Sequence, residues 1–228
     1  MRLENMRQIV TFDAYGTLVD FQLGPTTVRV LADRLDLDGL NVEEFLDDFR
    51  VMRFQAVLEA YRSYDEVLHS SLENAMRLHG LEYRRSDGDA LVEAVPTFGP
   101  FPEVPDALRA LKTRYEIAII SNTDDDLIKQ NIANIGVEFD HVITAQQAKA
   151  YKPSRETFEY AYQAMDIDPA SVIHVAQGWE YDLIPTRDLG LKRRVWINRY
   201  GRRGSSNYQT YDELRDLSGV PALLGVSA

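Results

Sequence analysis

The chain has 228 residues, 45% of them hydrophobic and 27% charged, and a formal net charge of −11. Its length suits one large domain or a core with a smaller inserted domain, and its charge argues against nucleic acid and anionic membrane surfaces as partners. The absence of cysteine excludes disulfide bonds, Cys-ligated zinc and thiol catalysis. Residues 1–8 are too polar for a signal peptide, and no apolar run reaches the ~20 residues of a membrane helix, so we expect a cytoplasmic protein.

The first predicted element is a short buried strand, Ile9–Phe12, which is apolar and ends at an aspartate. In an open parallel sheet, the carboxyl ends of the strands line the crevice that holds the ligand, so Asp13 is a candidate site residue. Gly16 lets the chain turn closely at this point, and Thr17 offers a hydroxyl group. An isolated aspartate is more often a turn or helix cap, and the later segments decide between the two roles.

Residues 20–95 have helical patterning, and we expect them to form a helical domain inserted after the first strand. Asn41 can cap one of these helices, with Glu44 as its capping-box partner, and Gly80 is suited to end another. The expected helical segments are Val28–Leu35, a helix after Asn41 that extends to about Leu58, Tyr64–Leu78 and Asp89–Val95.

Strands and helices alternate in the rest of the chain, which predicts an α/β fold, a parallel sheet with helices on both faces. The predicted strands are Ile117–Ile120, His141–Thr144, Ser171–Ala176 and Arg194–Ile197. The predicted helices are Asp106–Lys112, Asp124–Asn134, Ser154–Met165 and a segment that runs through Leu189 to Gly190. We therefore expect a core made of residues 1–19 and 96–228, with residues 20–95 inserted.

Polar side chains stand at the ends of the predicted strands or at the starts of helices, where parallel strands would bring them to one crevice. They are Asp13, Thr17, Ser121, Asn122, Lys152 and Asp182. Taken singly, each has an ordinary structural role, as a helix cap, a surface lysine or an ion-pair partner. Their order along the chain is more specific, since each follows an apolar strand or precedes a helix.

In this order the motifs resemble those of the haloacid dehalogenase superfamily, over about residues 7–200. The matching segments are Asp13–Leu18, Ser121-Asn122, Tyr151–Pro153 and the segment that ends at Asp182. The resemblance implies a Rossmann-like doubly wound core, residues 1–19 and 96–228, and a small helical cap domain, residues 20–95.

Two positions depart from the phosphatases of this superfamily. Those enzymes carry a second aspartate as general acid where this chain has Tyr15, and an acidic magnesium ligand where it has Gln177. The Asp-x-Tyr-Gly-Thr-Leu motif and the segment Val195–Arg199 instead resemble L-2-haloacid dehalogenases. Those enzymes usually have small polar residues, often Ser and Asn, in the fourth motif, where this chain has Gln177, Gly178 and Trp179.

The resemblance implies hydrolysis of short 2-haloalkanoic acids to 2-hydroxy acids through an aspartyl ester, with no metal or other cofactor. Asp13 would be the nucleophile, and Asp182 would orient or activate the water that attacks the ester. Lys152 would keep Asp13 ionised, because a nearby cation favours the carboxylate. Thr17 and Ser121 would bind the substrate carboxylate or orient Asp13.

The remaining site residues surround the substrate, a small halogenated carboxylic acid. The halide would leave toward Asn122 and a cap arginine, Arg50 or Arg53. Tyr15 would shape the pocket, and Trp179 would belong either to the pocket wall or to the core. A homodimer is compatible with the resemblance.

Two alternatives remain open. One is a magnesium-dependent phosphatase for a small metabolite, against which Tyr15 and Gln177 argue. The other is a non-catalytic domain that binds an anion or a partner, against which the intact Asp13 and Lys152 argue. The four histidines have no metal-ligand spacing, and His174, within a predicted buried strand, is expected to be a hydrogen-bonded core residue.

Overall fold

The computed structural model describes residues 8–35, 40–205, 207 and 210–226. Its centre is a six-stranded sheet in the order β3-β2-β1-β4-β5-β6, and all of the strand pairs are parallel. The strands are β1 Ile9–Phe12, β2 Glu116–Ser121, β3 His141–Thr144, β4 Val172–Ala176, β5 Arg193–Ile197 and β6 Asp212–Leu214. Because β1 is central and covered on both faces, all four of its residues are fully buried.

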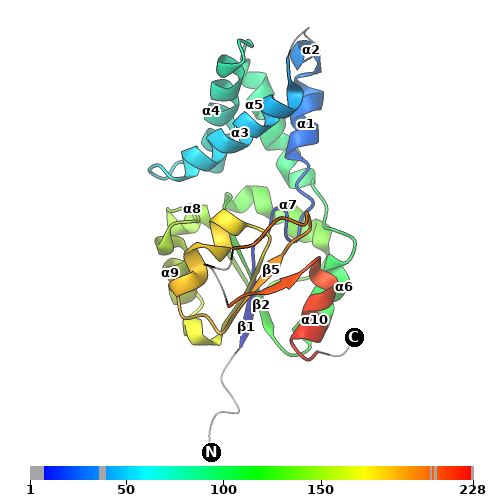
Figure 1. Ribbon diagram of the computed structural model, residues 1–228, viewed down its shortest axis with the longest axis vertical. Coiled ribbons are helices and arrows are strands. Elements are labelled where there is room, and N and C mark those ends of the chain that lie inside the picture. Colours follow the sequence, from blue (N-terminus) through cyan, green and yellow to red (C-terminus); the bar gives the residue numbers. More distant parts are fainter. Residues whose placement is uncertain (1–7, 36–39, 206, 208–209, 227–228) are drawn as a thin grey trace, which may run out of the picture.

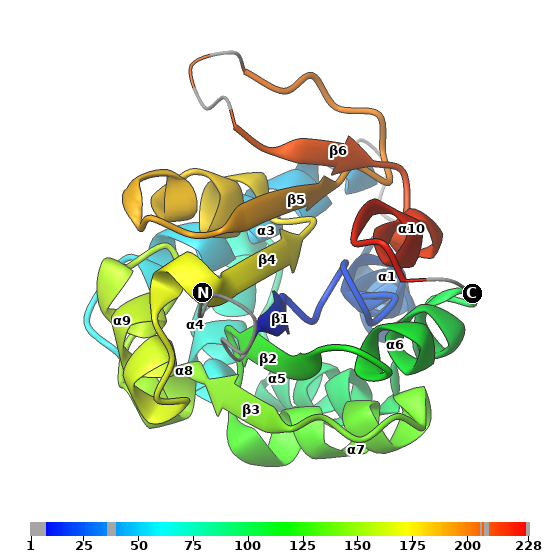
Figure 2. The ribbon, with the colours of Figure 1, turned by 90° about the horizontal axis from the view of Figure 1, so that it is seen from below.

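Helices cover both faces of the sheet, so the predicted α/β class and doubly wound arrangement are confirmed. Figure 2 shows α8 and α9 on one face and α6, α7 and α10 on the other. Their bounds are α6 Val104–Lys112, α7 Asp125–Ile135, α8 Ala145–Ala148, α9 Arg155–Ala164 and α10 Val220–Leu223. The described helices include none that is both long and apolar enough to cross a membrane.

Residues 20–95 form helices where described, as predicted, and Figure 1 shows them gathered beyond one end of the sheet. They are α1 Leu23–Val30, α2 Ala32–Leu35, α3 Val42–Val57, α4 Tyr64–Leu78 and α5 Arg85–Ala94. The side chain of Asn41 accepts hydrogen bonds from the main-chain N–H groups of Glu43 and Glu44. Ser63 and Glu66 form a capping box at the start of α4. We propose that this helical group is the cap domain.

Several segments differ from the sequence-based expectation: the helix expected over Val28–Leu35 is divided at Leu31 into α1 and α2, and α8 was not predicted. The predicted helix through Leu189 is instead a π-helical turn, Trp179–Leu183, followed by a 3-10 turn, Pro185–Asp188. Pro185 has no main-chain N–H to continue a regular helix, which accounts for the break. The edge strand β6 was not predicted, because its three residues Asp212–Leu214 are mostly polar and carry little strand signal.

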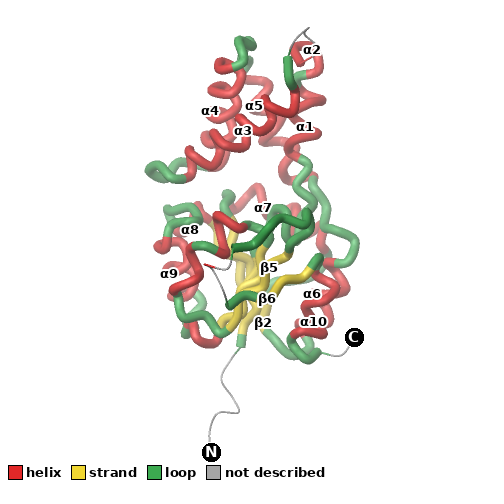
Figure 3. The backbone as a smooth tube through the Cα atoms, in the orientation of Figure 1, coloured by secondary structure: helices red, strands yellow, loops and turns green. Residues whose placement is uncertain are grey.

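Figure 3 shows the helices of the cap, in red, beyond the strands of the core, in yellow. The core contacts the cap at the N-terminus of α4, through the carboxylate of Asp124, the residue that precedes α7. Asp124 Oδ2 accepts hydrogen bonds from the N–H of Tyr64 at 2.8 Å and of Asp65 at 3.4 Å. A second bond nearby runs from the Tyr151 hydroxyl to the carbonyl of Arg62, at 2.8 Å. The N-terminal N–H groups of a helix have no partner within the helix, so Asp124 satisfies them from another part of the chain.

We expect Asp124→Ala to lower the free energy of unfolding by about 1 kcal/mol, the usual cost of losing a helix cap. Urea unfolding of the purified protein measures this. Asp126→Ala is the matched control, since that residue is exposed and is the second residue of α7. Equal unfolding midpoints for the two variants would contradict the role given to Asp124.

Candidate active site

Asp13 leaves β1 at the carboxyl end of the sheet and is held there by its neighbours. Its main-chain N–H donates to the carbonyl of Val175 at 3.1 Å, which continues the hydrogen bonding between β1 and β4. The following turn depends on Gly16, whose φ of +87° lies in the region that favours glycine. This turn brings the Thr17 hydroxyl back to Asp13 Oδ2, at 2.7 Å. The same hydroxyl accepts a hydrogen bond from the N–H of Gln177 at 2.8 Å, so its proton is directed at Asp13.

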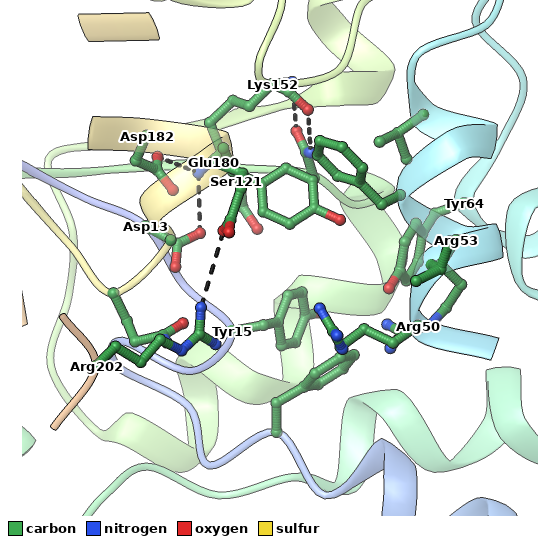
Figure 4. A pocket seen from close by; sticks show the side chains of 18 residues that line it. Asp13, Tyr15, Arg50, Arg53, Tyr64, Ser121, Lys152, Glu180, Asp182 and Arg202 are labelled. Carbon is green, nitrogen blue, oxygen red and sulfur yellow. Dashed lines mark hydrogen bonds and ion pairs between the residues drawn. The ribbon is translucent and has the colours of Figure 1, made fainter. Parts of the chain in front are cut away.

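Lys152 joins the two carboxylates of the site. Its ammonium Nζ donates to Asp13 Oδ1 at 2.9 Å, to Asp182 Oδ1 at 2.7 Å and to the carbonyl of Ile120 at 2.9 Å. These three bonds use all three N–H donors of the ammonium. The side chain is 1% exposed, so the ion pairs are shielded from water (Figure 4).

Asn122 holds Lys152 in place rather than projecting freely into the pocket. Its Oδ1 accepts from the main-chain N–H of Lys152, and its Nδ2 donates to the carbonyl of the same residue, both at 2.7 Å. The loop before α9 is thereby fixed to the end of β2. The structure thus brings Asn122 to the site. Its contacts position Lys152, which is a different role from the halide ligand that was predicted.

Behind Asp182 lies a chain of hydrogen bonds that sequence reasoning missed. His174 Nε2 lies 3.0 Å from Asp182 Oδ1, and His174 Nδ1 lies 2.8 Å from Thr11 Oγ1. All three side chains are buried. His174 is the hydrogen-bonded core histidine that was expected, but it also supports a site residue. Its place in a strand, eight residues before Asp182, gave no signal of that contact.

The site opens into a cavity of about 410 Å³ between the sheet and the helical cap (Figure 4). The predicted residues Asp13, Tyr15, Arg50, Arg53, Ser121, Asn122, Lys152 and Asp182 all line it. The other lining residues are Phe21, Val51, Phe54, Val57, Tyr64, Gln177, Gly178, Glu180, Tyr181 and Arg202. The lining combines charged groups with aromatic and aliphatic side chains, which suits a small organic anion.

Comparison with known proteins identifies the family. A family model of haloacid dehalogenase-like hydrolases matches residues 8–185. The chain belongs to this family. The resemblance seen in the motifs is therefore confirmed, and the protein is a hydrolase.

The individual relatives of this hydrolase include dehalogenases. It is 28% identical to the (S)-2-haloacid dehalogenase of Pseudomonas sp. (strain YL), over 96% of this chain and 95% of the relative. It is also 28% identical to haloacetate dehalogenase H-2 of Moraxella sp. (strain B), over 85% of this chain and 87% of the relative. The structure of L-2-haloacid dehalogenase from Xanthobacter autotrophicus has the same fold, with a TM-score of 0.82, 22% identity and coverage of 98% and 100%.

The cap supplies two arginines to the wall of the pocket, and the structure holds them differently. Arg50 is mostly exposed, with its guanidinium 3.4 Å from Asp47. Arg53 lies over the ring of Phe49, 4.9 Å from its centre, and its Nε is buried without a hydrogen-bond partner in the described part of the chain. A guanidinium held against an aromatic ring in this way has a donor available for an anion.

Two buried polar atoms of the site also lack a hydrogen-bond partner among the residues described. They are Ser121 Oγ and Asp182 Oδ2, and both residues line the cavity. Buried polar groups are rarely left unpaired, so each is a candidate contact for substrate or water. Ser121 can donate to a substrate oxygen, and Asp182 can accept a proton from water.

Tyr15 forms part of the pocket wall, as predicted. Its hydroxyl donates to Asn131 Oδ1 at 3.0 Å, and its ring packs on Phe21 with the centroids 5.0 Å apart. Burial raises the pKa of this hydroxyl above its ordinary value, so Tyr15 stays neutral at physiological pH. Its contacts are those of a fixed wall residue.

Of the two places considered for Trp179, the pocket wall and the core, the structure favours the core. Its ring packs against Trp196 and Tyr211, with centroid distances of 4.7 Å and 5.5 Å. The π-helical turn that begins at Trp179 directs the side chain toward β5, and Gln177, Gly178, Glu180 and Tyr181 face the cavity in its place. The structure therefore assigns Trp179 to an aromatic cluster beside the site.

Arg199 supports the turn that follows Asp13, residues 14–17, and sequence reasoning gave it no role. Its guanidinium donates to the carbonyls of Gly16 at 3.2 Å and Thr17 at 2.7 Å. It also pairs with Glu103 at 2.7 Å and lies 3.6 Å from the centre of the Phe101 ring. The resemblance of Val195–Arg199 to a dehalogenase segment was the available signal, although it did not identify these contacts.

The charges of the site are strongly coupled. Burial raises the pKa of the Asp13 carboxyl above its ordinary value; the Lys152 ammonium opposes this rise, and the Asp182 carboxylate adds to it. For Asp182, burial is outweighed by Lys152 and His174, which hold its pKa below the ordinary value. Burial would also lower the pKa of Lys152, but the two carboxylates outweigh it and raise that pKa. Lys152 therefore remains a cation, and Asp13 is the less stable of the two anions.

The described residues contain no cluster of three or more His, Asp or Glu side chains arranged to hold a metal ion. Asp13 Oδ1 and Asp182 Oδ1 both face the Lys152 ammonium, which holds the position between the two carboxylates. The expectation that the reaction needs no metal stays a prediction.

We expect Lys152→Met to lower the free energy of unfolding by about 3–5 kcal/mol at neutral pH, because it leaves two buried carboxylates without their cation. Without Lys152, both carboxyl pKa values in the folded state rise above those of the unfolded state. The folded variant then binds protons more tightly, so the loss shrinks as the pH falls toward about 4.

Urea unfolding at pH 7.5 and pH 5 measures this difference. Lys129→Met, at an exposed position of α7, is the matched control and should change little at either pH. A Lys152→Met loss that is equal at the two pH values would show that lost packing, not lost charge, causes it.

Proposed function

We propose that this hydrolase removes the halogen from short 2-haloalkanoic acids and produces 2-hydroxy acids, without a metal. The observation that carries the proposal is the buried Asp13 carboxylate, hydrogen-bonded by Lys152 and Thr17 at the floor of a cavity that is suited to an organic anion. Tyr15, a neutral residue, stands where the phosphatases of the superfamily carry their general acid. The relatives named as haloacid dehalogenases support the same reaction.

In the first step, one oxygen of Asp13 attacks the carbon that bears the halogen. The new C–O bond forms as the C–halogen bond breaks, and the bonding pair leaves with the halide. An ester between Asp13 and the substrate results. The departing halide is stabilised by the N–H groups of a cap guanidinium, Arg50 or Arg53.

The substrate carboxylate needs a donor close to the nucleophile, and Ser121 meets this requirement. Its hydroxyl oxygen is buried, lies on the cavity wall and has no hydrogen-bond partner within the described residues. A hydrogen bond from Ser121 to the substrate carboxylate would place the neighbouring carbon beside Asp13.

In the second step, water attacks the carboxyl carbon of Asp13 rather than the substrate carbon. Asp182 Oδ2 is buried without a partner among the described residues and can accept the proton of this water, while His174 and Lys152 hold Oδ1. Lys152, which already donates to Asp13 Oδ1, stabilises the oxyanion that forms there. Collapse of this intermediate breaks the acyl C–O bond, and the alkoxide takes up the proton held by Asp182 to give the 2-hydroxy acid. The Asp13 carboxyl then releases the second proton of the water and returns to the carboxylate.

We expect the native protein to release chloride from (S)-2-chloropropionate in the presence of EDTA, and Asp13→Asn to release none above background. An amide is a far weaker nucleophile than a carboxylate, so the first step fails in this variant. Ion chromatography measures the chloride. Asp126→Asn, an exposed position that removes the same charge, is the matched control and should retain the native rate.

The same assay separates the alternatives. Loss of chloride release in EDTA with recovery in magnesium would contradict the metal-independent mechanism. Phosphate release from small phosphorylated metabolites that requires magnesium, with no chloride release, would favour a phosphatase. Failure to release either product would favour a non-catalytic binding domain.

A further inference from the structure

The cavity is larger than a short haloacid requires. A water molecule accounts for about 30 Å³ of the liquid, so the six non-hydrogen atoms of 2-chloropropionate correspond to roughly 180 Å³. The cavity has about 410 Å³. More than half of it is therefore left for a longer substrate, and the side chains that line this part determine which one.

Arg202 lines the cavity but has no part in the proposed chemistry, and the fold holds its main chain in place. The side chain of Asn198 accepts from the N–H of Arg202 at 2.9 Å and donates to its carbonyl at 2.8 Å. A third bond, from Asn198 Nδ2 to Glu213 at 2.6 Å, fixes Asn198 itself to the edge strand. Figure 4 shows Arg202 entering the cavity from a different side than the cap arginines Arg50 and Arg53.

The present partner of Arg202 is a weak one. Its Nη1 lies 3.8 Å from Glu180 Oε2, beyond a normal hydrogen bond, and the two side chains are 45% and 50% exposed. Exposed pairs of this kind contribute little, on the order of 0–1 kcal/mol. A ligand carboxylate that approaches Arg202 from the cavity could make two shorter, charge-assisted hydrogen bonds instead.

The charge of the lining favours such an exchange. The cavity is lined by the cations Lys152, Arg50, Arg53 and Arg202 and by the carboxylates Asp13, Asp182 and Glu180, a formal charge of +1. When Glu180, which is half exposed, turns into solvent, the remaining lining carries +2. A substrate with two negative charges would then neutralise the lining. Its second carboxylate would replace that of Glu180 beside Arg202.

We propose that the preferred substrate is a 2-halo dicarboxylic acid, with its second carboxylate bound by Arg202. This inference rests on the proposed dehalogenation and adds the class of substrate to it. Asp13 attacks the halogen-bearing carbon as before, and Arg202 touches only the far end of the chain. Arg202 is therefore a specificity-determining residue, and Glu180 competes with the substrate for it.

The test compares acids of equal length with and without the second carboxylate. The pairs are 2-bromosuccinate with 2-bromobutanoate, 2-bromoglutarate with 2-bromopentanoate, and 2-bromoadipate with 2-bromohexanoate. Bromide release gives kcat/KM for each, and the ratio within a pair reports the contribution of the second carboxylate. We expect the ratio for the native protein to be about 10 or more for at least one pair of acids. This is the contribution expected from one charge-assisted hydrogen bond.

Variants of Arg202 and Glu180 test whether Arg202 causes the preference for the second carboxylate. Arg202→Gln should lower the ratio toward 1, mainly through KM, and Glu180→Gln should raise it by freeing Arg202. Arg203→Gln is the matched control, since it removes the same charge from an exposed neighbour and should keep the native ratio. The two variants should change the kcat/KM ratio in opposite directions. A general loss of folding would not produce that combination.

The outcomes separate this inference from the proposed function. Bromide release from both members of every pair at similar kcat/KM, with no effect of Arg202→Gln on the ratio, would overturn the preference for dicarboxylic acids and leave the dehalogenation intact. The absence of enzyme-dependent bromide release from all six acids, with chloride still released from (S)-2-chloropropionate, would overturn this inference alone. The absence of halide release from (S)-2-chloropropionate as well would overturn the proposed function, and this inference with it.

Discussion

The rest of the site depends on one buried ammonium group. Lys152 Nζ makes hydrogen bonds to Asp13, to Asp182 and to the carbonyl of Ile120, and so connects the ends of three elements of the core. Two carboxylates could not both be buried as anions at this distance without a cation between them, because the desolvation of each costs several kcal/mol. The same contacts that permit burial also place Asp13 at the floor of the cavity.

The surrounding contacts fix the geometry of that arrangement from several sides. Asn122 hydrogen-bonds the main chain of Lys152, and His174 hydrogen-bonds Asp182. Arg199 donates hydrogen bonds to two carbonyls of the turn that follows Asp13. Each partner belongs to a different part of the sheet edge, so the site exists only in the folded core. The cap adds arginines and aromatic rings above it, and Asp124 connects the cap to the core at the start of α4. In the proposed reaction, the core would provide the chemistry, and the cap and the loop that carries Arg202 would provide the selectivity.

Sequence reasoning located the groups that stand at strand ends, and missed those that act through side-chain geometry. Asp13, Ser121 and Lys152 were identifiable because parallel strands bring their carboxyl ends together whatever the details of packing. Arg199 and Arg202 follow a strand as well, but the directions of long flexible side chains are set by contacts such as Phe101 and Asn198, which no local pattern contains. For Trp179 the sequence left the pocket wall and the core both open, because the direction of its side chain depends on the π-helical turn that begins there. The polar edge strand β6 was missed because pairing with β5, rather than its own composition, makes it a strand.

The central claim is that Asp13 attacks the substrate carbon and that water later attacks Asp13. A single turnover in oxygen-18 water, with enzyme in excess over (S)-2-chloropropionate, tests it most directly. The account predicts that the peptide containing Asp13 gains one oxygen-18 atom and that the 2-hydroxy acid carries none, since its hydroxyl oxygen comes from Asp13. Oxygen-18 in the 2-hydroxy acid, with an unlabelled Asp13 peptide, would show direct attack by water on the substrate and contradict the account.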